Sequence, residues 1–345
     1  MTDKNYCMSA YLALRFIEKE DVDFCDKMKH RNVVPPAVED RIPVKTATEI
    51  DDQLRRLIGE AKGEKLGIFL SGGMDSAILA TYMKGCDAYT FRFLNGGFQK
   101  EEMERAEYYA RKNDITLHYV DIDWSVVEKN LETLMSVKCA PVHSIEPQIY
   151  EAAMQAKSDG ITTVVVGELA DTIFGGLDGL LSQDWDFEPF MKRYVFTSPE
   201  DVLNEPVSMQ YLFERYRIGE KIDFQKFMED VFLVESLGSY FNSFRAADMK
   251  YLAPYSFLKM GEPLDLKRIR NGESKYLIRE LFKMKYPEMD VPQKLPMPRP
   301  VDQYLSGWSG PTRSEFKKNL DMTHFTGNQK WQLFCLEKFL DLFRL

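Results

Sequence analysis

Short apolar runs alternate with amphipathic stretches through the first half of the chain. Apolar or β-branched runs predict strands at 66–70, 88–93, 117–122 and 161–166. Apolar residues at helical spacing predict helices at 47–61, 76–83, 100–113 and 149–157. The run at 161–166 is β-branched throughout, which is typical of a strand covered on both faces. The alternation therefore predicts an α/β fold with a doubly wound parallel sheet.

The pattern differs at both ends of the chain. An apolar run at 8–16 predicts a strand, and a Val-Val-Pro-Pro segment at 33–36 predicts a turn or linker. From about residue 187 helical patterns dominate, with long segments at 224–237, 274–285 and 330–345. We therefore expect an N-terminal extension (1–46), an α/β domain (47–186) and a mainly helical C-terminal region (187–345).

A glycine-rich segment follows the strand predicted at 66–70, and a helix is predicted immediately after it. Its residues are Ser71-Gly72-Gly73-Met74-Asp75-Ser76. Glycines let the backbone turn tightly and present its N–H groups, which form an anion site together with the next helix N-terminus. Asp75 alone would repel a phosphate, so it indicates a Mg²⁺ ion between the two. The alternative is a plain strand–helix turn whose Asp and Ser cap the helix.

A second motif with two carboxylates follows the strand predicted at 161–166. It reads Gly167-Glu168-Leu169-Ala170-Asp171-Thr172-Ile173-Phe174-Gly175-Gly176. On a helical turn Glu168 and Asp171 would share a face, so one can bind metal while the other acts as a base. The alternative is a helix start with acidic residues near its positive end.

Charge and cysteine usage narrow the class of partner. The formal net charge is −9, whereas proteins that bind nucleic-acid backbone normally carry an excess of Lys and Arg. The five cysteines contain no C-x-x-C pair, which favours free thiols in a reducing cytosol over a zinc site or disulfides. No long apolar run or export signal is present. We therefore expect a cytoplasmic protein that binds neither nucleic acid nor a membrane.

The two motifs together resemble a known family. The first resembles the S-G-G-x-D-S signature of the PP-loop ATP pyrophosphatases. The second resembles the S-G-E-G-A-D-E-L-F-G-G segment of the asparagine synthetase C-terminal domain. The resemblance implies an adenine-nucleotide α-hydrolase-like fold that uses ATP and Mg²⁺. It also implies that a small-molecule carboxylate is adenylated with release of pyrophosphate, and that the acyl group passes to ammonia or another amine.

The resemblance assigns roles to individual residues. Asp75 and Asp171 would be Mg²⁺ ligands, and Glu168 would be the general base for the attacking amine. Lys294 would be a catalytic cation that contacts pyrophosphate. The nucleotide would lie against Leu70, Ser71, Gly72, Gly73, Asp75, Ser76, Phe93, Val166, Gly167 and Lys275. Lys275 is as readily a solvated surface residue, and Leu70, Phe93 and Val166 are as readily core residues.

The sequence also departs from the family pattern. Val166 replaces a Ser, Leu169 a Gly, Thr172 a Glu and Phe257 an Asp. Position 2 is Thr2 rather than the catalytic Cys of a glutaminase, and about fifty residues precede the predicted sheet domain, fewer than a typical domain has. We therefore expect the nitrogen to come from free ammonia, from a separate glutaminase subunit or from another amine.

Two other functions remain open. One is a different adenylating enzyme, similar to NAD synthetases or to tRNA-modifying enzymes. The second motif counts against the NAD synthetases, and the acidic charge without paired cysteines counts against tRNA thiolases. The other is a catalytically inactive nucleotide-binding protein, which predicts loss of the acidic ligands although Asp75 and Asp171 are both present.

Overall fold

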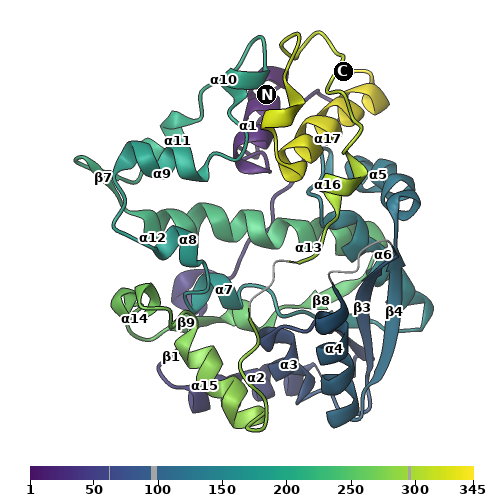
Figure 1. Ribbon diagram of the computed structural model, residues 1–345, viewed down its shortest axis with the longest axis vertical. Helices are drawn as coiled ribbons and strands as arrows, with labels where there is room; N and C mark the ends of the chain where they lie inside the picture. Colours follow the sequence, from purple (N-terminus) through teal and green to yellow (C-terminus); the bar gives the residue numbers. More distant parts are fainter. Residues whose placement is uncertain (62, 95–98, 294–296) are drawn as a thin grey trace.

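A five-stranded parallel sheet organises the fold (Figure 1). The computed structural model describes residues 1–61, 63–94, 99–293 and 297–345. Within them the sheet has the order β4-β3-β2-β5-β8. Its strands are β2 (Leu66–Phe69), β3 (Asp87–Phe93), β4 (Thr116–Ile122), β5 (Thr163–Val165) and β8 (Lys250–Leu252). The α/β fold with a parallel sheet, predicted from the alternating pattern, is therefore confirmed.

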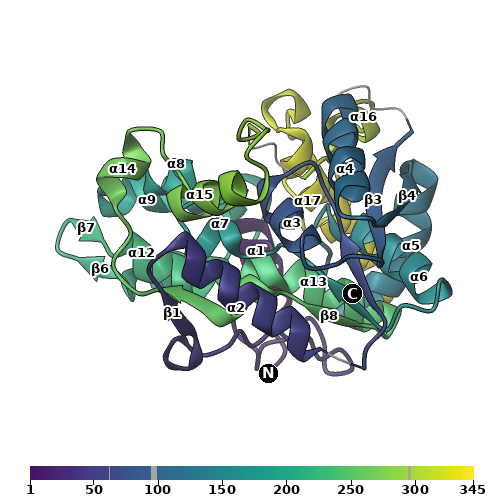
Figure 2. The same cartoon turned by 90° about the horizontal axis from the view of Figure 1, so that it is seen from below.

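Alternate side chains of the central strands point into two separate hydrophobic cores. Ile68 belongs to the core beneath α2, α3, α4 and α15, whereas the next residue, Phe69, belongs to the core beneath α5, α6 and α13. Figure 2 shows α2, α3 and α15 on one side of the sheet and α6 and α13 on the other. The doubly covered sheet explains why β5 has no polar face: Thr163 is buried, and Val164 and Val165 are fully so.

Helices make up a large part of the remaining chain. Their bounds are α1 Lys4–Leu14, α2 Ala47–Glu60, α3 Met74–Ala80, α4 Lys100–Lys112, α5 Trp124–Lys138, α6 Glu146–Ser158, α7 Ala170–Ile173, α8 Asp178–Leu181, α9 Phe187–Tyr194, α10 Pro199–Val202, α11 Gln210–Glu214, α12 Phe224–Phe227, α13 Leu233–Ala247, α14 Leu266–Arg270, α15 Tyr276–Lys285, α16 Val301–Tyr304 and α17 Gly327–Phe343. Two short pairings complete the fold. β1 (Ile42–Val44) runs parallel to β9 (Leu258–Met260), and β6 (Arg217–Ile218) runs antiparallel to β7 (Lys221–Ile222). The helical C-terminal region is confirmed.

The strand predicted at 8–16 is wrong, because this segment is the helix α1. Asp3 caps it by accepting a hydrogen bond from the Tyr6 N–H at 2.9 Å. Every residue from Tyr6 to Leu14 is buried, so the helix has no polar face. A short, continuously apolar run has no period from which helix and strand can be told apart.

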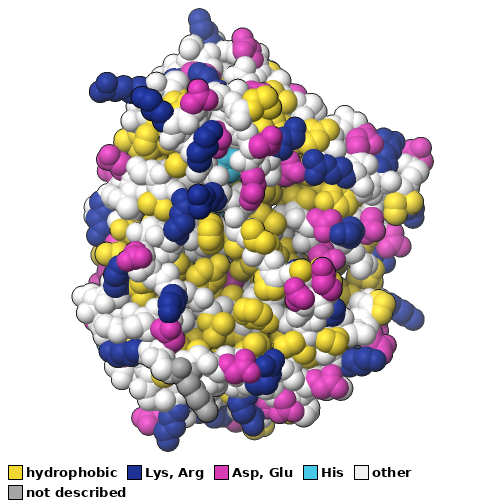
Figure 3. Space-filling model, turned by 180° about the vertical axis from the view of Figure 1, so that it is seen from behind, with side chains coloured by type: hydrophobic (Ala, Val, Ile, Leu, Met, Phe, Trp, Pro, Cys, Tyr) yellow, Lys and Arg dark blue, Asp and Glu magenta, His cyan; other side chains and the backbone are white. Residues whose placement is uncertain are grey.

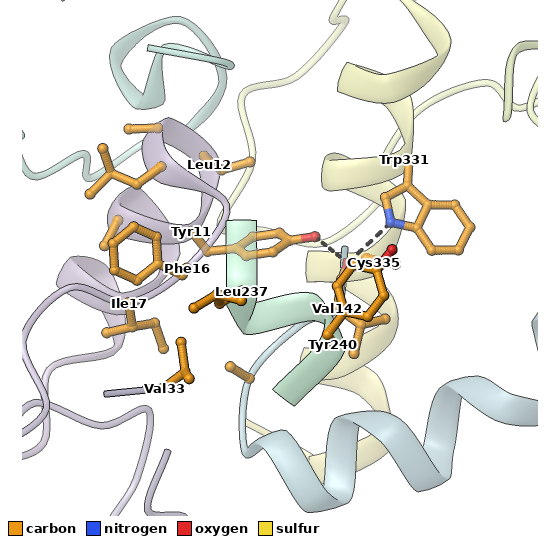
Figure 4. Close-up of a cluster of buried hydrophobic side chains, with 14 of the residues drawn as sticks. Tyr11, Leu12, Phe16, Ile17, Val33, Val142, Leu237, Tyr240, Trp331 and Cys335 are labelled. Atoms are coloured by element: carbon orange, nitrogen blue, oxygen red, sulfur yellow. Dashed lines mark hydrogen bonds between the residues drawn. The ribbon is translucent and has the colours of Figure 1, made fainter. Parts of the chain in front are cut away.

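The first helix packs against the last one, so the two ends of the chain share one core. The Tyr11 hydroxyl and the Trp331 indole N–H both donate to the carbonyl of Val142, at 2.9 and 3.1 Å (Figure 4). Gln332 of α17 also donates to the Tyr11 carbonyl at 3.0 Å. These bonds satisfy polar groups inside an apolar cluster, where an unpaired group would be costly.

The surface carries both signs of charge. Seen from behind, hydrophobic side chains gather in a hollow across the middle, and Lys and Arg are interspersed with Asp and Glu around it (Figure 3). Among the described residues, none of the helices combines the length and apolar character needed to cross a membrane.

Candidate functional site

Both sequence motifs border one cavity at the carboxyl edge of the sheet. β2 and β5 are neighbours, with Ile68 beside Val165 in register, so the loops that follow them meet. The loop after β2 contributes Ser71, Asp75 and Ser76, and the loop after β5 contributes Gly167, Glu168 and Asp171. The cavity has a volume of about 200 Å³. This is the edge at which open α/β sheets bind ligands.

The glycine-rich loop (residues 71–76) is closed by its own hydroxyl groups. The Ser71 hydroxyl accepts from the Gly73 N–H at 3.1 Å, and the Ser76 hydroxyl accepts from the Ser71 N–H at 3.1 Å. The two hydroxyls lie 3.0 Å apart. α3 begins at Met74, so its N-terminus and the loop face the same cavity, as an anion site requires.

Helix α4 packs closely on this loop through Gly72. A Cβ atom there would lie 2.6 Å from the carbonyl oxygen of Glu102, so only glycine fits. Arg105 donates from Nε to the Gly72 carbonyl at 3.0 Å, and the Gly72 N–H faces the Glu102 carboxylate. Burial raises the pKa of Glu102, which also borders the cavity. The sequence pattern of α4, that of a charged amphipathic helix, did not predict that Arg105 and Glu102 would contact Gly72.

Asp75 and Asp171 converge on the ammonium group of Lys275. Its Nζ lies 2.6 Å from both Asp75 carboxylate oxygens and 3.0 Å from Asp171 Oδ1. Burial works against the charge of Lys275, but the two carboxylates raise its pKa, so it stays protonated. A Cβ atom on Gly176 would collide with both Asp171 and Lys275, which explains the glycine at that position.

Lys275 is 4% exposed, so the structure does not support a solvated surface position for it. It lies at the N-terminus of α15 with a φ of 53°, an uncommon conformation for a non-glycine residue. Its contact with ATP stays a prediction. The predicted pyrophosphate contact Lys294 falls outside the described residues.

The carboxylate oxygens of Asp75 and Asp171 are the kind of ligand that Mg²⁺ prefers. Two carboxylates that share one ammonium are close enough to share one cation, and Mg²⁺ in phosphate-transfer sites takes one or two carboxylates plus phosphate oxygens and water. Within the described part of the chain, no group of three or more His, Cys, Asp or Glu side chains is arranged to hold a metal. The remaining Mg²⁺ ligands would therefore come from phosphate and water.

Glu168 occupies an environment that suits an acid–base group. It follows β5, and the next residue, Leu169, has a φ of 70° at the start of α7. Burial raises the pKa of Glu168 to about 7, and the nearby charge of Asp171 adds to this, whereas a hydrogen bond from Ser236 opposes it. A carboxyl group with a pKa near neutrality is suited to take a proton at physiological pH.

Ser236 and Tyr240 of α13 complete the surroundings of Glu168, and neither was predicted. The Ser236 hydroxyl donates to Glu168 Oε1, and the Tyr240 hydroxyl also hydrogen-bonds this carboxylate. Tyr240 is 5% exposed and borders the cavity. Their spacing of four residues on a helix is the only signal in the sequence, and it is shared by countless core positions.

The predicted nucleotide contacts divide into two groups. Leu70 and Gly167 border the cavity with the loop serines, and Gly72 and Gly73 shape the loop behind them. Phe93 and Val166 are buried and do not border the cavity, and the Phe93 N–H donates to Gln99 Oε1 at 2.9 Å. The aromatic wall comes instead from Phe69, Tyr89 and Phe91. Alternation along β3 places Phe91 and Phe93 on one face, so the sequence alone did not separate them.

Residues 50–255 match the family model described as asparagine synthase, which is more than half of the chain. No curated protein matches the sequence. The similar solved structures include the following three, each with low sequence identity and a low TM-score. U34-tRNA thiolase NcsA from Methanococcus maripaludis, with its 4Fe–4S cluster, is 12% identical over 73% of this chain and 83% of its own, with a TM-score of 0.30. NMN synthetase from Francisella tularensis is 12% identical over 73% and 97%, with a TM-score of 0.28. NAD+ synthetase from Burkholderia pseudomallei is 10% identical over 72% and 91%, with a TM-score of 0.28.

Proposed function

This chain belongs to the asparagine synthase family, and on that premise we propose that it is an ATP-dependent amide-forming ligase. In the proposed reaction a carboxylate oxygen attacks the α-phosphorus of ATP, and pyrophosphate leaves. An amine then attacks the carbonyl carbon of the acyl-adenylate, AMP leaves, and the amine loses a proton. The carboxylate is a small molecule, and the amine is ammonia or a larger amine.

The observation that carries this proposal is the meeting of two different kinds of group at one cavity. The glycine-rich loop and the N-terminus of α3 offer an anion site on one side. Glu168, with its pKa raised by burial to about 7, offers a base on the other side. A site that only bound a nucleotide would need the first group and not the second.

The described residues divide the work between the two half-reactions. Asp75 and Asp171 would hold Mg²⁺, which would neutralise charge on the phosphates. Lys275 balances these carboxylates and keeps them in place. Glu168 would accept the proton of the amine at one of its carboxylate oxygens. Lys294 is proposed for pyrophosphate on the family resemblance alone.

The proposal allows three nitrogen sources. Glu168 suits any amine that must lose a proton, so free ammonia, ammonia supplied by a separate glutaminase subunit and another amine all agree with it. A comparison of ammonium chloride with glutamine and with primary amines in amide formation would separate these sources.

The test is ATP–pyrophosphate exchange with a panel of carboxylates. We expect exchange that requires both Mg²⁺ and one class of carboxylate, because adenylation is reversible and needs no amine. Omission of the carboxylate from the same mixture is the control for contaminating exchange. Absence of carboxylate-dependent exchange across aliphatic, aromatic and amino acids would contradict the proposal and favour an inactive nucleotide-binding protein.

A further inference from the structure

We infer that Ser236 and Tyr240, both on α13, are positioning residues that hold the Glu168 carboxylate in place for attack by the amine. The chemistry of this role rests on the proposed function, whereas the contacts do not. Helix α13 lies outside both sequence motifs and enters the site from the C-terminal region. The second half-reaction would thus depend on a helix that neither sequence motif includes.

Two side-chain hydroxyls donate to the Glu168 carboxylate, which also accepts from the Leu169 backbone N–H. Ser236 Oγ donates to Glu168 Oε1, and the Tyr240 hydroxyl bonds the same group. Burial and the charge of Glu168 raise the pKa of Tyr240 well above its ordinary value, so Tyr240 remains a protonated donor. A carboxylate has about four acceptor positions, so these three donors fix its plane and still leave a position for an amine proton.

Glu168 needs this support because the local backbone holds its carboxylate only through the Leu169 N–H. The residue lies in the turn between β5 and α7, outside any regular element. A Glu side chain has three rotatable bonds, and in a turn its carboxylate would sample several positions. General-base catalysis requires a position defined to within a few tenths of an ångström, which packing and supporting hydrogen bonds provide.

Helix α13 can act as a support because buried polar pairs fix its rotation. Glu235, next to Ser236, pairs with Arg15 Nε at 3.0 Å. Further along, Asn242 donates to Glu146, and the Ser243 hydroxyl donates to the Glu146 carbonyl at 3.1 Å. If α13 rotated, each of these polar side chains would lose its hydrogen-bond or ion-pair partner, and leaving a buried polar group unpaired is costly.

A π-helical turn sets which face of α13 reaches Glu168. The turn covers Met228–Phe232, immediately before α13 begins at Leu233. One inserted residue rotates the following helix by roughly 100° compared with an unbroken α-helix. With that rotation Ser236 and Tyr240, four residues apart, both face the carboxylate.

The first test is structural and does not depend on activity. A crystal structure of the Ser236→Ala/Tyr240→Phe double variant is compared with one of the wild-type protein. We expect the Glu168 carboxylate to move by more than about 0.5 Å or to lose defined density, because both hydroxyl donors are gone. An unmoved, equally ordered Glu168 would overturn the positioning role, whatever reaction the protein performs.

The second test separates the half-reactions with the carboxylate that supports exchange and with ammonium chloride as the amine source. Ser236→Ala and Tyr240→Phe should each keep ATP–pyrophosphate exchange within about twofold and slow single-turnover amide formation by about 10- to 100-fold. Ser236→Thr, which keeps the hydroxyl, should restore amide formation. Equal losses in both half-reactions, or no loss in amide formation, would overturn the role.

Matched controls exist on the same helix and in the same region. Ser239 lies on the same helix three residues beyond Ser236 and does not border the cavity; its backbone carbonyl, which an alanine keeps, accepts from the Ser243 hydroxyl at 2.8 Å. The hydroxyl of Tyr194 is buried with no hydrogen-bond partner among the described residues. Ser239→Ala and Tyr194→Phe should leave the ratio of the two half-reaction rates unchanged. Failure of exchange in the wild-type protein would count against the proposed function alone.

Discussion

The two sides of the cavity are built in different ways. The loop side is local: residues 71–76 lie in one continuous stretch between β2 and α3, and their hydroxyls close the turn. The base side is assembled over distance, because Glu168 lies 68 positions before Ser236, to which it is hydrogen-bonded. A site built from consecutive residues can be recognised as a sequence motif, whereas a site assembled from distant residues can be recognised only in the tertiary structure. The two sides should also fail differently when they are changed.

The largest effect is expected on the loop side, from Asp75→Asn. This change removes a charge that both Lys275 and the proposed Mg²⁺ site depend on, so exchange should fall by about 1,000-fold or more and amide formation with it. Asp87→Asn is the control, because Asp87 pairs with His118 at 2.8 Å and does not border the cavity. Full exchange activity in Asp75→Asn would remove Asp75 from the metal site.

On the base side, Glu168→Gln should separate the half-reactions that Asp75→Asn abolishes together. The amide keeps the shape of the side chain but cannot accept a proton, so amide formation should slow by about 100- to 10,000-fold while exchange is retained. Both rates are measured on the same preparation. Parallel losses in the two rates would mean that Glu168 serves adenylation, and the two sides would not be distinct.

A steric change tests how tightly α4 packs on the loop side. Gly72→Ala places a Cβ atom 2.6 Å from the Glu102 carbonyl oxygen, so we expect exchange to fall by about 10- to 100-fold and the melting temperature to drop. Gly59→Ala is the matched control, because Gly59 lies in α2 with open space around its Cβ position. It should raise stability by about 0.5–1 kcal/mol without changing exchange. A fully active Gly72→Ala protein would show that α4 can shift freely.

The smallest expected effect is a pH dependence confined to the base side. The pKa of Glu168 is raised by burial to about 7, so the basic form is lost as pH falls below that value, and amide formation should decline by up to tenfold per pH unit. Exchange should not share this decline. A common pH profile for both half-reactions would place the controlling group elsewhere.

The same group has a predictable effect on stability. Its pKa in the folded protein lies above the ordinary value of 4.5, so the folded state binds the proton more tightly than the unfolded chain does. Stability from this group is therefore complete below about pH 4.5 and is lost as pH rises towards 7. Relative to Glu168→Gln, the free energy of unfolding of the wild-type protein should fall across this window. Chemical denaturation at several pH values measures it, and no change between the two proteins would contradict the raised pKa.

The sequence was most informative where chemistry follows directly from a strand. The four strands predicted in the first half are present, and their order required a parallel sheet whose carboxyl edge carries both motifs. It was least informative where a segment is apolar on all sides, as in α1, or short and half-buried, as in β8. Periodicity distinguishes helix from strand only when one face is polar over several residues; α1 has no such face, and the three residues of β8 are too few to show a period.

What the sequence determined by itself was the set of reactive groups and the edge of the sheet at which they stand. Two acidic motifs behind two apolar runs were enough for that, because parallel strands end at one edge. Only the tertiary structure decided which groups touch. It buried Lys275 between Asp75 and Asp171, and it brought Ser236 to Glu168. Such contacts depend on the packing of distant elements and on the rotation of α13. The local sequence pattern predicts neither of these.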